Sequence, residues 1–299
     1  MLMKKFIYVV IGALGIAAIA GASSLFIDNQ ANGKRLNMPM FAPDDFDFDF
    51  NFDDNGSAKI DYGKVQTKSV RVSNFTEIDA STGIRVIYTQ GPLSDVKIKA
   101  PEKLLPMVKC KVSGSELTLG IQRKSGNFSM PREGVEVTIT APNLRDIELS
   151  SGASFTVAGQ LAPKGKLTID CSSGAQVNIE QLKGSALEVD MSSGSQLNIS
   201  EGSATNASFD LSSAASAVVK SFTASNVAAD LSSASHLELT GKGNQLQVDA
   251  SSAASFKGRK FKVENATVDV SSTASVSVFA THDQVDCDRN STYVNYFEH

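Results

Sequence analysis

The sequence contains no Trp, and among its 299 residues there are only 3 Cys, 3 His and 8 Pro. Aromatic residues make up 7% of the chain, which argues against one thick core and favours many short, tightly turning strands. The cysteines Cys110, Cys171 and Cys287 are odd in number and follow no regular spacing, which excludes a disulfide framework and a cysteine-based zinc site. With so few histidines, a transition-metal site built on paired imidazoles is not expected.

A basic stripe is also absent from the sequence. The net charge is -4 and the calculated pI is about 5.5, so nucleic acid is not an expected partner. No phosphate-cradling glycine loop and no nucleophile elbow occurs, and we therefore expect no cofactor.

The first 22 residues form a targeting segment. Lys4 and Lys5 precede the apolar run "FIYVVIGALGIAAIAGA", and small residues follow at the positions that a signal peptidase prefers. The apolar run can also be extended from Phe6 to Ile27, which is long enough to span a bilayer as an uncleaved anchor. We favour a cleaved export signal over an anchor. Either interpretation places the rest of the protein in the periplasm or at the cell surface, with membrane contact only through this segment.

Three further regions flank a long repeat. Residues 23–66 lose apolar periodicity and contain "FAPDDFDFDFNFDD", which indicates an acidic, Phe/Asp-rich linker. Residues 67–147 alternate period-two apolar patterns with turns and predict an N-terminal β region. Residues 286–299 leave the repeat, and Tyr293, Tyr296 and Phe297 are expected to cap its last coil.

The repeat itself occupies residues 148–285. Its seven copies begin with an acid followed by an apolar residue and a Ser pair, as in "DMSSGSQL" and "DLSSASHL", and the first serines are separated by 22, 20, 20, 20, 19 and 20 residues. A period of 20 is too short for a pair of helices but fits one turn of a β-solenoid. The sequence therefore predicts an all-β fold, a parallel β-solenoid with coils of about 20 residues. The segment "DASTGIRV" at residues 79–86 is a weaker copy.

Side-chain parity predicts which positions of each coil are buried. The residue after each acid is apolar, as are the residues one before it and seven and nine after it, with Gly258 as the exception, and all share one face of a strand. The buried file after the acids comprises Leu149, Cys171, Met191, Leu211, Leu231, Ala250 and Val270. The second Ser of each pair shares this parity, so Ser173, Ser193 and Ser213 are expected to point inward. Gly174 could adopt a positive φ at the corner, but Ala214, Ala234 and Ala253 replace it later, which suggests that positive φ is not required.

The acids have outward parity and form one column. Its members are Glu148, Asp170, Asp190, Asp210, Asp230, Asp249 and Asp269. At a strand spacing of about 4.8 Å, adjacent like charges repel by roughly 0.9 kcal/mol in water before screening. Either the following Ser hydroxyls and backbone N–H groups offset this repulsion and lower the pKa values, or cations bind along the column. We favour the hydrogen-bond donors and keep the acid column as the candidate metal site.

The sequence resembles one known family. The segments "FTEIDASTGIRVIYTQG" and "APNLRDIELSSGASFTV", followed by the train of "SSGA" coils, are similar to the putative auto-transporter adhesin, head GIN domain family of Bacteroidetes envelopes. The resemblance extends from about Phe75 to the C-terminus, with Arg85 where the Gly-Ile-Asn signature of the family has Asn. It implies a β-solenoid outside the cytoplasm and carries over no catalytic residue.

The expected function is therefore that of a non-enzymatic envelope protein that presents a solenoid surface to a glycan or an envelope protein. The alternatives are a polysaccharide-active β-helix enzyme and a structural spacer or sensor domain. Catalysis by the acid column is not expected, because its members recur identically with no unique residue beside them.

Overall fold

The computed structural model describes residues 61–122, 130–131 and 133–280 in full, and four outlying strands by their backbone alone. The chain forms two compact units, 1–61 and 62–299. In the first unit, strands β1 (Phe50–Phe52) and β2 (Ala58–Ile60) form an antiparallel pair. The predicted targeting segment at residues 1–22 lies outside the described residues. Within the described part of the chain, no helix is long and apolar enough to cross a membrane.

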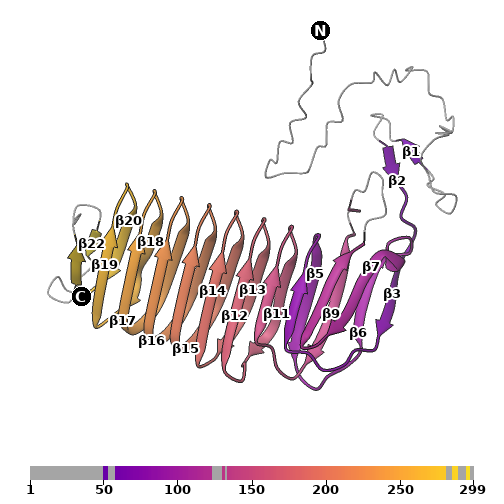
Figure 1. Ribbon diagram of the computed structural model, residues 1–299, viewed down its shortest axis with the longest axis horizontal. Helices are drawn as coiled ribbons and strands as arrows, with labels where there is room; N and C mark the ends of the chain where they lie inside the picture. Colours follow the sequence, from indigo (N-terminus) through magenta and orange to yellow (C-terminus); the bar gives the residue numbers. More distant parts are fainter. Residues whose placement is uncertain are drawn as a thin grey trace, which may run out of the picture. The chain divides into compact units, whose positions relative to one another are not determined.

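The second unit is a β-solenoid, which confirms the predicted fold class (Figure 1). Each coil contributes one strand to a first face, which carries the acids, one to a second face and a short segment to a third face. In stacking order the first face comprises β7 (Val108–Ser113), β8 (Glu116–Ile121), β4 (Glu77–Ala80), β10 (Asp146–Leu149), β12 (Lys166–Cys171), β14 (Ala186–Met191), the C-terminal parts of β15 (Gln196–Leu211), β16 (Ser216–Leu231) and β17 (His236–Ala250), then β19 (Asn265–Val270) and β21 (Val285–Asp288). The second face comprises β3 (Val65–Val70), β6 (Val96–Pro101), β9 (Val135–Ala141), β5 (Ile84–Gln90), β11 (Ser154–Leu161), β13 (Gln176–Lys183), the N-terminal parts of β15 to β17, then β18 (Ser255–Lys262), β20 (Ser275–Phe279) and β22 (Val294–Tyr296).

The N-terminal end of the stack does not follow the order of the sequence. Strands β4 and β5 pair in parallel with β10 and β11, so the weaker repeat copy is itself a coil of the solenoid. Strands β8 and β9 come later in the chain but stack in parallel on the outer side of β4 and β5. Antiparallel pairing of β7 with β8, β6 with β9 and β3 with β6 then covers this end, with the 3-10 helix η1 (Leu105–Met107) between β6 and β7. These pairings extend the two faces, so β7 and β3 are their outermost strands at this end.

At the other end, the backbone continues the stack. Strands β21 and β22 pair in parallel with β19 and β20, although the sequence has left the repeat. The side chains of Tyr293, Tyr296 and Phe297, which were expected to cap the last coil, lie outside the residues whose side chains are described.

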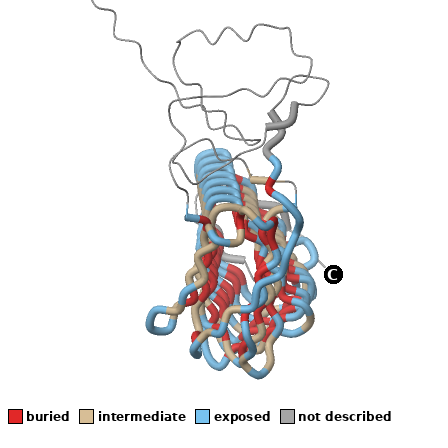
Figure 2. Tube along the Cα trace, turned by 90° about the vertical axis from the view of Figure 1, so that its right-hand side faces the viewer, coloured by how far each residue is buried: buried red, intermediate tan, exposed pale blue. Residues whose placement is uncertain are grey.

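The core lies between the faces, as the parity of the repeat predicts (Figure 2). All seven residues that follow the acids are buried, with at most 2% of their surface exposed. On the third face, Phe222 and Phe261 are fully buried beside glycines of neighbouring coils. A Cβ atom on Gly202 would lie 2.7 Å from Phe222, and one on Gly243 would lie 2.9 Å from Phe261. Because glycine has no side chain, Gly202 and Gly243 leave room for the phenyl rings of the next coil.

The Ser-Ser corner is a tight turn that repeats in each coil. In the second full repeat, Ser173 and Gly174 have φ values of +52° and +72°, and the N–H of Ala175 donates to the carbonyl of Ser172 at 3.1 Å. Two successive positive φ values define a type I′ turn. The N–H of Gly174 also donates to the carbonyl of Ser193 in the next coil at 3.0 Å, so hydrogen bonds join the turns as they join the strands.

Two predictions about this corner are wrong. Ser173, Ser193 and Ser213 are exposed, because the positive φ values rotate the chain and break the alternation that holds in a strand. Positive φ is also required where Gly is absent, and three alanines adopt values of +62° to +63°: Ala214, Ala234 and Ala253. Each of them donates its N–H to the next turn at 3.0 Å, which holds it in a conformation that L-residues avoid.

The turn geometry makes a testable distinction between two substitutions. Nothing lies within 4 Å of a Cβ atom placed on Gly174, so Gly174→Ala tests backbone strain alone and should lower the free energy of unfolding by about 1 kcal/mol. Ala214→Gly removes the same strain, and we expect it to leave stability unchanged or raise it slightly. Urea unfolding of both variants measures the difference. An equal loss of stability in the two would show that φ is not the constraint.

A second pair of variants tests the small buried position after the turn. Ser195 and Ser235 occupy it, with at most 1% exposure, where other coils have Ala. The hydroxyl of Ser195 donates to the carbonyl of Cys171 at 3.1 Å, whereas Ser235 Oγ has no hydrogen-bond partner among the described residues. Ser195→Ala should therefore lower the free energy of unfolding by about 1 kcal/mol, and Ser235→Ala should raise it by about 1 kcal/mol. Thermal and urea unfolding check the opposite signs, and two changes of the same sign would contradict the prediction.

Candidate functional site

The predicted acid column exists and is longer than the repeat indicates. Backbone register aligns all seven acids, from Glu148 to Asp269, on the outer side of the first face. The same register places Asp79 of β4 beside Glu148 and position 288 of β21 beside Asp269. The column is a consequence of parallel pairing, because equivalent residues of successive coils lie at neighbouring positions of one sheet.

The electrostatics of the column contradict the favoured expectation. The pKa values of Asp170, Asp210 and Asp249 are raised above 3.8, first by partial burial and then by the neighbouring aspartates. Burial and adjacent acids likewise raise the pKa values of Asp79 and Glu148. The direction of these shifts is therefore opposite to the expected lowering, with partial burial as the first cause and repulsion between carboxylates as the second.

The column does not form a compact metal centre. Within the described residues, no three His, Cys, Asp or Glu side chains converge closely enough to hold a metal ion. The acids stand in single file along the strands from β14 onward, whereas further acids lie near Glu148 of β10, namely Asp79, Asp170, Asp146 and Glu116. The proposed cation role for Asp170, Asp190, Asp210, Asp230, Asp249 and Asp269 gains no support from this geometry.

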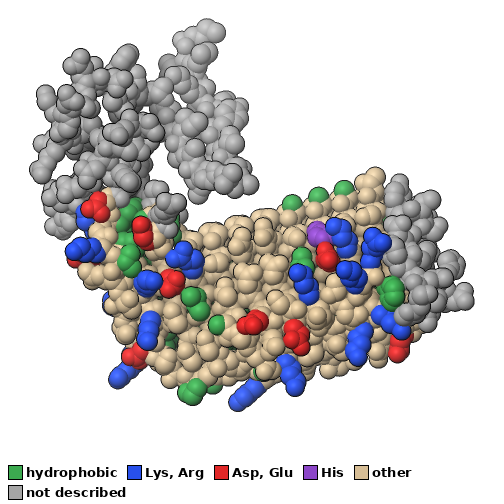
Figure 3. All heavy atoms as spheres, turned by 180° about the vertical axis from the view of Figure 1, so that it is seen from behind, with side chains coloured by type: hydrophobic (Ala, Val, Ile, Leu, Met, Phe, Trp, Pro, Cys, Tyr) green, Lys and Arg blue, Asp and Glu red, His purple; other side chains and the backbone are tan. Residues whose placement is uncertain are grey.

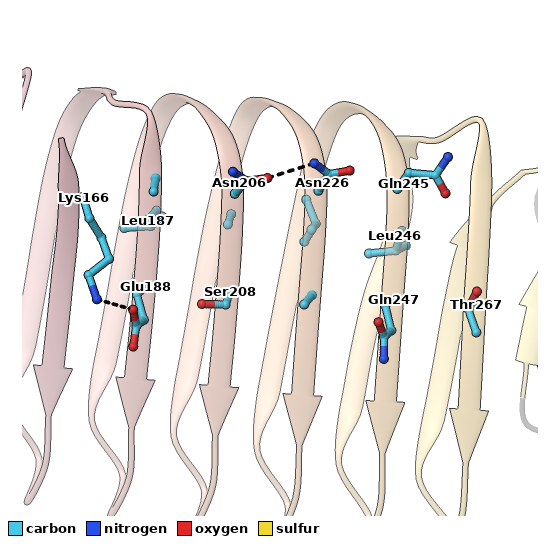
Figure 4. A pocket seen from close by; sticks show the side chains of 14 residues that line it. Lys166, Leu187, Glu188, Asn206, Ser208, Asn226, Gln245, Leu246, Gln247 and Thr267 are labelled. Carbon is cyan, nitrogen blue, oxygen red and sulfur yellow. Dashed lines mark hydrogen bonds and ion pairs between the residues drawn. The ribbon is translucent and has the colours of Figure 1, made fainter.

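A groove runs along the first face beside the column, over strands β12 to β19 (Figure 4). It has a volume of about 530 Å³ and crosses successive coils. Its floor and sides come from the outward residues two and four places before each acid, because strand alternation turns these positions to the same side as the acid. The residues two places before the acid include Ser208, Ala228 and Thr267, whose small side chains leave the space open.

Amide side chains line one edge of the groove. Asn206, Asn226 and Gln245 share one register position, and Asn226 Nδ2 donates to Asn206 Oδ1 at 2.8 Å. Gln245 and Gln247 project from β17, and within the described part of the chain neither side chain has a hydrogen-bond partner (Figure 4). Amides both donate and accept hydrogen bonds, so the groove presents neutral groups of both kinds to a ligand.

An ion pair lies at the end of the groove that is formed by β12 and β14. Lys166 Nζ lies 2.6 Å from Glu188 Oε2. Glu188 is the single carboxylate among the fourteen residues that line the groove, all of which are described. Acid–base cleavage of a glycosidic bond uses two carboxyl groups on either side of that bond, and the lining of this groove does not supply the second.

The sequence analysis missed this groove, although a signal for it exists. The three amide positions recur at steps of 20 and 19 residues, within the same period as the acids. Outward positions carry no hydrophobic periodicity, however, and the primary sequence does not tell which outward column borders a hollow.

The raised pKa values predict an unusual response to acid. A carboxyl group whose pKa is higher in the folded state contributes stability that is present below the unfolded value, here 3.8 for Asp, and is lost as pH rises through the folded value. The melting temperature should therefore rise as pH is lowered from 7 towards about 4. Asp210→Asn should raise the melting temperature at pH 7 and weaken this dependence, whereas the control Asp95→Asn removes an exposed charge outside the column. A melting temperature that falls on mild acidification would contradict the prediction.

Solved structures share this fold. A putative adhesin from Bacteroides fragilis superposes with a TM-score of 0.56 at 18% identity, over 79% of this chain and 97% of that one. A putative adhesin from Parabacteroides distasonis gives a TM-score of 0.66 at 18% identity, over 79% and 95% of the two chains. A protein from the same organism, described as a putative lipid binding protein, gives 0.64 at 13% identity, over 79% and 94%. No curated protein matches the chain.

The sequence profile of one family matches most of the solenoid unit. Its two matched segments are residues 74–238 and 215–287, which together cover more than half of the chain. They include the coil of β4 and β5, strands β6 to β9 and the Ser-Ser repeats. The chain therefore belongs to the family described as "Putative auto-transporter adhesin, head GIN domain".

Proposed function

We propose that this protein is a non-enzymatic binding module of the cell envelope and that its groove holds a neutral glycan strand. The observation that carries the proposal is the groove on the first face, which crosses successive coils and is lined by Asn206, Asn226, Gln245 and Gln247. The family is described as one of adhesins, which is consistent with a binding role.

The chemistry of the groove favours sugars over other ligands. Sugar hydroxyls donate and accept hydrogen bonds, and the groove offers amide and hydroxyl groups that do the same. These groups repeat along the stack at the strand spacing of about 4.8 Å, so a polymer lying along the axis meets similar partners at each coil. The apolar residues Leu187, Val227 and Leu246 line the groove through their backbone, because their side chains are buried in the core.

The same residues argue for binding without cleavage. The groove contains one carboxylate, Glu188, which is paired with Lys166. The aspartates of the column recur at one register position of successive coils, whereas a catalytic pair requires two groups in different environments. The export that an envelope role requires is supported by the family description and by Lys4, Lys5 and the apolar run after them.

A glycan screen with matched variants tests the proposal. The purified full chain is measured against neutral polysaccharides for both retention and cleavage, and we expect retention of at least one polymer without cleavage. Asn206→Ala combined with Asn226→Ala removes one amide pair from the groove and should weaken retention about tenfold. The control is Asn178→Ala combined with Asn198→Ala, which removes an equivalent amide pair, joined at 3.2 Å, from the second face.

The control separates binding from folding. Both double variants lose one hydrogen bond between coils, so their melting temperatures should change by similar amounts while only the groove variant loses retention. Equal loss of retention in both, or retention of no polymer by the unchanged chain, would contradict the proposal. Cleavage of a retained polymer would favour the alternative of a polysaccharide-active enzyme.

A further inference from the structure

Basic side chains gather on the second and third faces near the C-terminal end of the solenoid (Figure 3). Five of them, which we call the basic patch, come from two neighbouring coils: Lys242 of β17 and Lys257, Arg259, Lys260 and Lys262 of β18. All five are exposed, because Phe256, Gly258 and Phe261 take the buried positions of β18. The net negative charge of the chain conceals this local excess of positive charge.

Backbone register brings the charges of the patch close together. Lys242 lies beside Lys262 on adjacent coils, at the strand spacing of about 4.8 Å, and Lys257 and Lys260 follow along the same coil. The four lysines have no ion pair within the described part of the chain, and Glu238, beside Lys257, is the one acid in register with them. Like charges at opposed positions of a sheet destabilise it, so the arrangement does not serve folding.

The positive charge of Lys257 also acts on the nearby side chain of His236. The pKa of His236 is lowered from 6.5, first by burial and then by Lys257, while Glu238 opposes the shift. The acid column lies on the first face, whereas the basic patch lies on the second and third faces. A polyanion would be repelled by the acids and attracted to the basic patch.

We propose that the basic patch binds a strand of acidic polysaccharide that carries sulfate, phosphate or carboxylate groups. The charges form a narrow strip along one coil and onto the next, which suits a linear polyanion. Lysines are mobile point charges and tolerate variable spacing of the anionic groups. A membrane surface fits less well, because Val65 is the one exposed large hydrophobic residue among those described, and it lies on β3 at the opposite end of the stack.

The experiment compares dextran sulfate with neutral dextran as probes for the full chain. We expect binding to dextran sulfate only, with an affinity that falls between about 50 and 200 mM salt as counterions are released. Replacing Lys242, Lys257, Lys260 and Lys262 with Gln should weaken binding at least about tenfold and reduce the salt slope by about 0.7 for each lost contact. The control replaces Lys64, Lys68, Lys97 and Lys164 with Gln, which changes the net charge equally at exposed positions outside the patch.

Several outcomes would overturn the proposal. Equal binding of both dextrans, or equal weakening by the two sets of substitutions, would show that the patch is not a site. Tighter binding to vesicles of phosphatidylcholine and phosphatidylserine than to dextran sulfate would assign the patch to a membrane instead. The groove variant Asn206→Ala with Asn226→Ala should bind dextran sulfate normally, so this test is independent of the function proposed for the groove.

Discussion

Parallel backbone pairing between coils, at a register of 19 to 22 residues, is the constraint on which the rest of the structure depends. It extends through the turns as well as the strands, since the N–H of the residue after the Ser pair, such as Gly174, donates to the carbonyl of the second Ser in the next coil. This pairing satisfies the backbone of a long chain that has few bulky side chains. It also places every residue beside its equivalent one coil away, so each position of the repeat becomes a column on the solenoid.

The columns have opposite energetic effects inside and outside. Inside, files of Leu, Val, Ile and Phe exclude water, and glycines such as Gly202 and Gly243 make room for the rings of adjacent coils. Outside, the same register aligns carboxylates that repel one another, and the pKa values of Asp170 and Asp210 are raised first by partial burial and then by this repulsion. Burial of the inner files outweighs this repulsion, and the fold therefore tolerates an outer surface on which like charges are stacked.

Because the buried residues hold the fold together, the outward residues can vary and can serve binding. The first face combines the acid column with a neutral, amide-lined groove, whereas the second and third faces carry the basic patch. At the N-terminal end the stack changes from parallel to antiparallel pairing, with β3 and β7 as the outermost strands. The proposed ligands, a neutral glycan at the groove and an acidic polysaccharide at the patch, thus address different faces of one rigid scaffold.

The sequence by itself determined the repeat length, the solenoid class, the buried files and the acid column, because strand alternation and a fixed period are local properties that spacing reveals. Tertiary structure alone decided the positive φ of Ala214 and the exposure of Ser173, since hydrogen bonds to the next coil impose the turn conformation. It also decided that β8 and β9 stack outside β4 and β5, against the order of the chain. The groove and the basic patch depend on which outward residues of different coils become neighbours, and only the register of the folded stack establishes that.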